Sequence, residues 1–197
     1  HFLRPIPSMT IVQMTVDPDV GSVEGGFSVE AGSLLHSRAV GSVRCSFRTA
    51  YDVELYPVEV RGIEVVSTTA LRELVPERTR SALRIRLESV GGVPFSELGI
   101  DRLRFFLDAS SGDIHSLYEL FLRDPQGLVV RADESAPAVY LPPESIAPVG
   151  FGRDEGLLVY PPESFLGYRL LQEYFAFPDK FLFVELTVNT ESGGSLP

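Results

Sequence analysis

The sequence predicts a mainly β fold, either a β-sandwich or a partly open barrel, with two or three short helices. Apolar and polar residues alternate with a period of two in several runs, which is the pattern of half-buried strands. Turn-forming segments rich in Gly, Pro, Asp and Ser, at 17–26, 89–99 and 109–112, separate these runs. Only two stretches repeat their apolar residues with helical spacing. Many short strands with regular turns are typical of a sandwich or barrel.

The clearest alternating run predicts one long half-buried strand over residues 45–55. Its apolar face would carry Cys45, Phe47, Thr49, Tyr51, Val53 and Leu55. The same alternation predicts strands around Leu83–Glu88 and Arg102–Asp108, and a shorter strand through Val12, Met14 and Val16. Further strands are expected at Phe27–Val29, Leu34–Arg38, Val58–Val66 and Leu128–Arg131.

Two helices are predicted in the second half of the chain. Asp113 is positioned to cap a helix in which Ile114, Leu117, Tyr118 and Phe121 follow helical spacing. The second helix is expected over Pro162–Phe175, because Pro is suited to the first helical position. Its polar residues Arg169, Gln172 and Glu173 form one narrow stripe, and apolar side chains cover most of the remaining surface. A helix of this composition is expected to be buried on more than one side.

The strand that follows the second helix is apolar on both faces. Phe181 and Phe183 alternate with Leu182, Val184 and Leu186, so both faces are expected to be covered. We predict one β-rich domain over residues 1–190, with a possible subdivision near 67–81. Residues 150–190 would lead into the next part of a larger subunit, and 191–197 would form a flexible end. The chain therefore reads as a segment of a longer protein.

Composition excludes several functional classes. The net charge of −10 argues against nucleic-acid binding, which needs clustered cations. A single cysteine, Cys45, excludes an internal disulfide and favours a reducing compartment. No apolar run approaches the roughly 20 residues that cross a bilayer. Of 17 basic residues only Lys180 is a lysine, a bias that suits interfacial ion pairs but that genome base composition would equally produce.

The sequence holds no catalytic constellation, and no cofactor or metal site is predicted. Asp17, Asp19 and Gly21 resemble the opening of a calcium loop, but the fifth position is Gly, so a solvated hairpin loop is the better interpretation. His115 has no nucleophile elbow beside it, and His36 has no second ligand at metal spacing. Cys45 is expected to act as a small buried apolar residue.

The last third of the chain contains the most distinctive sequence motifs. It reads DEGLL at 154–158, YPP at 160–162, GYRLLQEYF at 167–175 and FPDKFLF at 177–183. Upstream segments contribute PIPSM at 5–9, CSFRTAY at 45–51 and YPVEV at 56–60. This ordered series resembles the TssF family, also called VasA or ImpG, over nearly all of the chain. Val159 and Asp179 depart from the residues usual in that family.

The resemblance implies a function that the residues alone do not name. TssF-like proteins are structural subunits of the bacterial type VI secretion baseplate, similar in role to the wedge proteins of contractile phage tails. The resemblance implies a cytoplasmic, non-enzymatic protein docked at the membrane complex of the donor cell. It also implies that TssG, TssK, a second TssF copy and other baseplate and spike components are its partners.

The apolar second helix and the doubly covered strand suit such an assembly subunit. We therefore expect partner contacts at Phe106, Tyr118, Phe165, Tyr168, Arg169, Tyr174 and Phe175. Alternatively, these side chains close the core of the chain itself. Two other functions stay open: a β-sandwich module that recognises carbohydrate or peptide through exposed aromatics, weakened by the absence of Trp, and a hydrolase that uses paired carboxylates.

Overall fold

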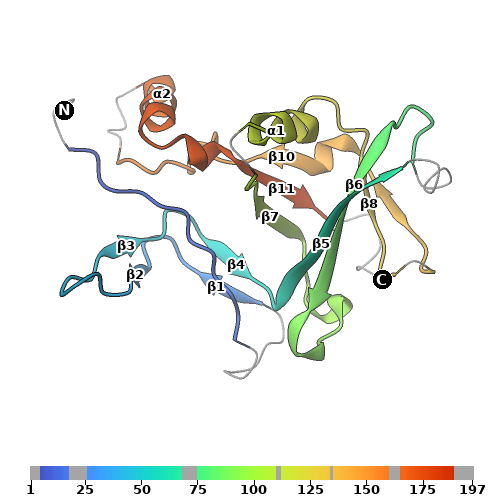
Figure 1. Ribbon diagram of the computed structural model, residues 1–197, viewed down its shortest axis with the longest axis horizontal. Helices are drawn as coiled ribbons and strands as arrows, with labels where there is room; N and C mark the ends of the chain where they lie inside the picture. The colour runs from blue at the N-terminus through green and yellow to red at the C-terminus, as the bar shows by residue number, and fades with distance from the viewer. Residues whose placement is uncertain are drawn as a thin grey trace.

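A computed structural model describes residues 5–17, 26–67, 75–109, 112–133, 135–159 and 165–188 of the chain. It confirms a mainly β protein with short helices. Within the described residues no closed barrel forms, and the strands are divided among five small sheets. The molecule is elongated, with a three-stranded sheet near its centre and two-stranded ribbons around it (Figure 1).

The central sheet has the antiparallel order β10-β11-β7, from Ile146–Pro148, Phe183–Thr187 and Arg102–Phe106. Its middle strand is β11, in which Val184 and Leu186 are buried and the alternate residues are half-buried. One face of this strand is therefore buried and the other, with Phe183, Glu185 and Thr187, is only half-buried, so the prediction that both faces are covered holds for one face. Register pairs Phe183 with Phe106, so strands far apart in sequence build the core.

The helix α1, Ile114–Leu122, covers this sheet (Figure 1). Ile114 is buried with Leu107 and Val184, and Leu117, Tyr118 and Phe121 pack around them. Helical spacing therefore predicted this apolar face correctly. The helix begins after Asp113 as expected, but among the described residues the Asp113 side chain makes no capping hydrogen bond to it.

The first half of the chain forms an interrupted antiparallel ribbon. The strand β1 (Phe27–Val29) pairs with β4 (Val53–Leu55), and β2 (Leu34–His36) pairs with β3 (Ser46–Arg48). The prediction of one long strand over residues 45–55 is wrong, because hydrogen bonds to the turn at 30–33 interrupt it. Thr49 Oγ1 accepts from the N–H of Ser33, and Asp52 Oδ1 accepts from that of Ala31.

Other predictions in this half need correction. Residues 5–17 form no strand within the described part of the chain, so the strand expected through Val12, Met14 and Val16 is wrong. Cys45 is exposed rather than buried. Asp19 and Gly21 of the calcium-like sequence lie outside the described residues.

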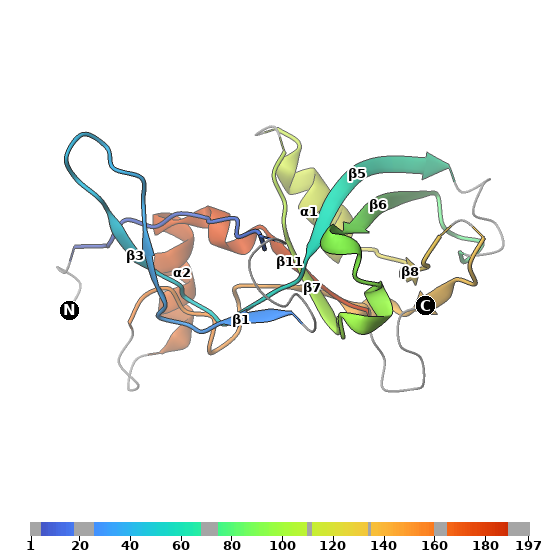
Figure 2. The same cartoon turned by 90° about the horizontal axis from the view of Figure 1, so that it is seen from below.

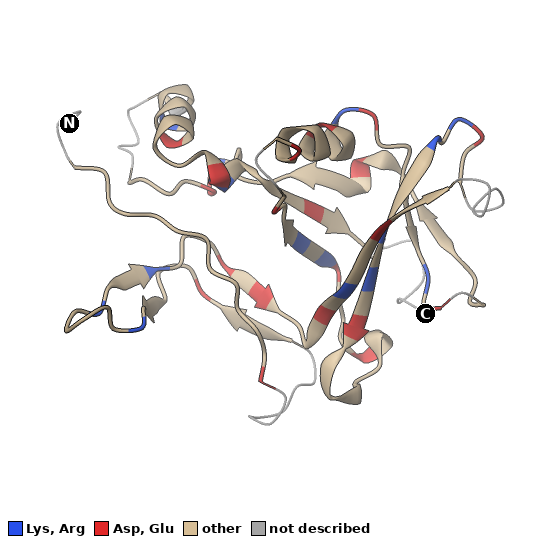
Figure 3. Ribbon diagram, viewed as in Figure 1, with Lys and Arg blue, Asp and Glu red and all other residues tan. Residues whose placement is uncertain are grey.

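A long ribbon projects at one end of the molecule (Figure 2). It consists of β5 (Val58–Ser67) and β6 (Ser81–Ser89), with a register shift between Val60 and Gly62. Residues of both charges follow one another along the ribbon (Figure 3). Within it, Arg61 pairs with Glu59 and Glu88. Ser67 at the end of β5 pairs with Ser81 at the start of β6. The subdivision of the domain near residues 67–81 stays a prediction.

The remaining elements are short. A ribbon of β8 (Leu128–Val130) and β9 (Val139–Leu141) lies beyond α1. Short 3-10 helices cover Val90–Gly92, Phe95–Glu97, Pro143–Ser145 (η4) and Pro178–Phe181 (η5). The second α-helix, α2, spans Leu166–Ala176 and contacts η5. It does not begin at Pro162 as predicted, because Phe165 is extended and precedes its first turn.

Candidate functional site: a buried charge cluster and an exposed aromatic helix face

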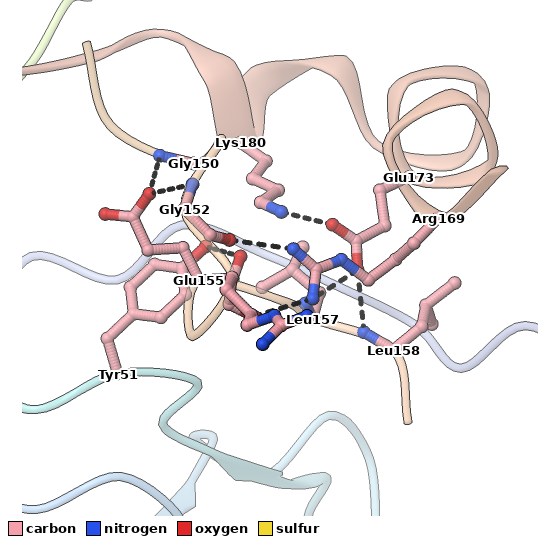
Figure 4. A network of polar contacts seen from close by, with 10 residues as sticks. Tyr51, Gly150, Gly152, Glu155, Leu157, Leu158, Arg169, Glu173 and Lys180 are labelled. Carbon is pink, nitrogen blue, oxygen red and sulfur yellow. Dashed lines mark hydrogen bonds and ion pairs between the residues drawn. The ribbon is translucent and has the colours of Figure 1, made fainter. Parts of the chain in front are cut away.

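Glu173 on α2 is the centre of a buried polar cluster (Figure 4). Its side chain is 0% exposed. One carboxylate oxygen, Oε1, accepts hydrogen bonds from the backbone N–H groups of Leu157 and Leu158, at 2.8 and 3.0 Å. The other oxygen, Oε2, pairs with the ammonium of Lys180 on η5. Glu173 therefore joins α2 to a preceding loop and to the following 3-10 helix.

Arg169 holds the same loop one helical turn earlier. Its guanidinium is buried and donates to the carbonyl oxygens of Gly152 and Arg153, at 2.7 and 2.8 Å. Its Nε lies 4.0 Å from Oε1 of Glu173, which is ion-pair distance but beyond hydrogen-bond reach. The planar fork of arginine suits two carbonyl acceptors, so the contact fixes the loop backbone as well as balancing charge.

Glu155 closes the loop on itself and Tyr51 ties it to the first half of the chain. The Glu155 carboxylate accepts from the N–H groups of Gly150 and Gly152, at 2.8 and 2.7 Å. The Tyr51 hydroxyl donates to the Glu155 carbonyl at 3.1 Å, and the Arg104 guanidinium lies over the Tyr51 ring. We call Tyr51, Glu155, Arg169, Glu173 and Lys180 the buried cluster. It contains two acids and two bases, so its formal charges cancel.

Burial shifts two titration equilibria in this cluster. Loss of hydration lowers the pKa of the Lys180 ammonium below its ordinary value, although the hydrogen bond and charge of Glu173 act in the opposite direction. Burial, and then the negative charges of Glu155 and Glu173, raise the pKa of the Tyr51 hydroxyl. Tyr51 therefore stays neutral at neutral pH and serves as a donor.

The opposite face of α2 is exposed and aromatic. Phe165, just before the helix, is 73% exposed, and Tyr168, Leu171, Tyr174 and Phe175 are 62%, 58%, 51% and 82% exposed. We call these five residues the α2 outer face. Tyr168, Leu171 and Phe175 follow i, i+3, i+7 spacing, so they project from one side of the helix. The helix thus turns its charges inward and its aromatics outward.

The predicted contact residues divide into two groups. Phe165, Tyr168, Tyr174 and Phe175 lie together on the α2 outer face. The rings of Phe106 and Phe183 are tilted by 46°, with centroids 4.9 Å apart, and Tyr118 packs against the core around Val184. Arg169 is buried in the cluster. Partner contact at all seven residues and the alternative of core closure both stay predictions.

The candidate chemical groups do not converge. His36 contacts Ser46, and no group of three or more His, Cys, Asp or Glu that could hold a metal is found among the described residues. Asp17 and His115 lie on separate segments, before β1 and in α1. In the part of the chain that the structure describes, no helix is long and apolar enough to cross a membrane.

Sequence reasoning missed Glu155, Glu173 and Lys180 as members of one site. The available signals were the narrow polar stripe on an otherwise apolar helix and the presence of a single lysine. Lysine is rarely fully buried, yet Lys180 is only 2% exposed. Neither signal predicted which backbone groups would meet these charges, since the contacts depend on how 150–158 folds back.

Comparison with known proteins identifies the family. Residues 1–194 match the family described as "Type VI secretion system, TssF". The chain belongs to the TssF family. It is 40% identical over 193 residues to the type VI secretion system component TssF1 of Pseudomonas aeruginosa, a match that covers 95% of this chain and 31% of the relative. The chain thus spans about a third of the length of that curated TssF protein.

A solved structure supports the fold. A chain in the structure of the type VI secretion system TssK-TssF-TssG baseplate subcomplex matches with a TM-score of 0.66 at 24% identity. The match covers 92% of this chain and 33% of that chain. The resemblance to TssF proposed from the sequence is therefore confirmed.

Proposed function

We propose that this TssF-family chain is a structural component of the type VI secretion baseplate wedge and acts by assembly with TssG and TssK. The observation that carries the proposal is the exposed aromatic face of α2. Large contiguous apolar patches on a protein surface mark interaction sites. The relatives, a secretion-system component and a chain of a baseplate subcomplex, suggest the assembly in which such a site would be used.

The distribution of apolar side chains over the molecule supports the same proposal. Among the described residues, nine apolar side chains are buried and twenty large ones are exposed. Several of the exposed ones, such as Ile63 and Val65, lie on the projecting β5–β6 ribbon. A two-stranded ribbon is marginally stable alone and needs a further layer on its apolar face. These faces suit an assembly in which further protein covers them.

We infer a structural rather than an enzymatic role. Among the described residues, the strongly buried ionisable side chains are Glu173, Lys180 and Arg169, and they are engaged by one another and by backbone groups. Catalytic groups must instead reach a substrate in a cleft. The cluster supports a loop and a helix, which is the task of a scaffold.

A second TssF copy, other baseplate and spike components, and a cytoplasmic position at the membrane complex belong to the same proposal. These partners and this position are proposed from membership of the TssF family, and each needs its own experiment. Light scattering of a purified complex gives the number of copies of the chain, and fluorescence imaging of a tagged chain in the donor cell gives its position.

Co-expression with TssG and TssK of the same organism tests the proposal directly. We expect an affinity-tagged chain to co-purify with TssG, TssK or both through affinity and size-exclusion steps. In the control, TssG and TssK expressed without the chain should not be retained on the affinity resin. If a longer TssF polypeptide binds and the chain does not, its contacts lie outside these residues. If neither binds, the proposed assembly is wrong for this protein.

A further inference from the structure

Residues 9–16, with the sequence MTIVQMTV, run along the molecule as an extended coil (Figure 1). Five of these eight residues are Val, Ile or Thr, the types that favour strands. Within the described residues, however, no backbone hydrogen bond joins this segment to another strand. The polar contact found there is local, from the Thr10 hydroxyl to the adjacent Ile11 carbonyl. The 9–16 segment thus has the composition of a strand without a neighbouring strand.

One side of the 9–16 segment rests on the molecule. The side chains of Met9, Ile11, Met14 and Val16 are half-buried, whereas that of Val12 is 49% exposed. These apolar contacts hold the segment in place. They leave the backbone N–H and C=O groups along its edge available to a neighbouring strand.

The 9–16 segment also lacks the charges that protect an open strand edge. It contains no Asp, Glu, Lys or Arg. The strands β5 and β6 differ in this respect and carry charges of both signs, at Glu59, Arg61, Arg84 and Arg86. Charges keep such edges from pairing with other chains, whereas an uncharged run of about seven residues with strand propensity is an aggregation hazard when it stays open. The segment therefore suits a permanent cover.

The remainder of a TssF polypeptide is the occupant that these properties favour. The matches cover 31% of the TssF relative and 33% of the chain in the solved structure, so about two-thirds of each lies outside the matched region. A strand of the same polypeptide is present at high effective concentration from synthesis onward. A strand of another protein arrives by diffusion, and until then the uncharged segment would be open to association with other copies. Two copies paired through this segment alone would form a two-stranded ribbon, which is marginally stable.

We propose that residues 9–16 form a β-strand in a TssF polypeptide of family length, paired with a strand from the part of that polypeptide outside this chain. Recognition is by strand addition, in which backbone hydrogen bonds supply most of the affinity. Because the segment offers apolar side chains and no charge, the strand opposite it is expected to be rich in Val, Ile, Thr or aromatic residues. The inference rests on membership of the TssF family and is independent of assembly with TssG and TssK.

Hydrogen exchange tests the pairing. We expect the amides of residues 10–16 to exchange at least about 100-fold more slowly in TssF of family length than in this chain, with TssG and TssK absent from both samples. The amides of β11, the middle strand of the central sheet, are the internal reference and should be protected in both. Equally rapid exchange of residues 10–16 in the two polypeptides would overturn the proposal.

Two further conditions identify a different occupant. If protection of residues 10–16 in the longer polypeptide appears only after TssG and TssK are added, another protein supplies the strand and the proposal is wrong. If protection increases with protein concentration, a second copy supplies the strand and the proposal is again wrong. Both results leave the proposed function intact, because co-purification tests it separately. Failure of co-purification would, in turn, leave the strand pairing intact.

Adjacent proline substitutions distinguish strand pairing from simple apolar cover. Proline donates no backbone hydrogen bond, and successive N–H groups of a strand point to opposite edges. In the polypeptide of family length we therefore expect Val12→Pro or Gln13→Pro to abolish protection of the segment, and both to do so where the strand is paired on two sides. Ser8→Pro, outside the segment, is the control and should retain protection. Protection that survives both Val12→Pro and Gln13→Pro would mean cover without strand pairing, and the proposal would be wrong.

Discussion

The two α-helices of this protein are both amphipathic, but they face the core in opposite ways. α1 packs its apolar side, with Ile114 and Leu117, on the central sheet and leaves Glu119 and Arg123 outside. α2 packs Arg169 and Glu173 inward and leaves Tyr168, Leu171 and Phe175 outside. Burial of apolar surface explains α1 fully, but for α2 it would favour the reverse orientation.

The difference arises from what each helix meets. α1 lies on a sheet whose side chains, Leu107 and Val184, are apolar. α2 meets the backbone of the loop at 150–158, in which the N–H groups of Leu157 and Leu158 and the carbonyl of Arg153 bond to α2 side chains. Buried backbone groups must be satisfied. Glu173 and Arg169 supply those partners. The orientation of a helix therefore depends on the chemistry of the segment it packs against as much as on its own pattern of apolar and polar side chains.

The largest test of this contrast is removal of the central acid of α2. Glu173→Leu leaves the Lys180 ammonium buried without a counter-ion and two backbone N–H groups without an acceptor, so we expect a loss of about 3–5 kcal/mol in the free energy of unfolding. The double variant Glu173→Leu with Lys180→Met should recover part of this loss. Urea denaturation measures both, and a single-variant loss below 1 kcal/mol would contradict the role of the cluster.

A matched pair of leucines compares the two helices directly. Leu117→Ala on α1 should cost about 2–3 kcal/mol, because its side chain packs on the buried core. Leu171→Ala on α2 should change stability by less than about 0.5 kcal/mol, because the side chain is exposed. Both values come from the same denaturation experiment. Equal losses would mean that the α2 outer face is covered within the chain itself.

A smaller effect is expected where the loop passes the Arg169 guanidinium. A Cβ added at Gly156 would lie 2.9 Å from its Nη1 atom, which the carbonyl of Arg153 holds in place. Gly156→Ala should therefore cost about 1 kcal/mol, after the entropic gain of replacing glycine. Gly112→Ala is the control, since an added Cβ there meets nothing within 4 Å. Thermal unfolding of the two variants measures the difference.

At neutral pH a similarly small effect is expected at the link from Tyr51 to the loop, and it depends on pH. Burial raises the pKa of Tyr51 in the folded chain, so above pH about 10 the unfolded chain loses this proton first. The unfolded state then binds fewer protons, and stability falls as pH rises through this range, by up to about 1.4 kcal/mol per pH unit. Tyr51→Phe should reduce this slope and cost about 1 kcal/mol at neutral pH. An unchanged slope would exclude Tyr51 as its source.

Sequence periodicity predicted local structure well. It located β1, β5, β6, β7, β8 and α1 with at most small errors at their ends, because alternation and helical spacing report which side of an element is buried. It failed at residues 45–55, where the alternation continues without interruption. There Thr49 and Asp52 bond to the turn at 30–33 and divide the run between two ribbons.

The sequence by itself determined the family, the mainly β class and the positions of the two helices, because these follow from ordered motifs and from local spacing. The tertiary structure decided how the described strands separate into five small sheets and which side of α2 is buried. The physical reason is that both outcomes depend on hydrogen bonds to backbone groups distant in sequence. A helix sequence shows that Arg169 and Glu173 share a side, whereas only the folded loop at 150–158 supplies the partners that make this side the buried one.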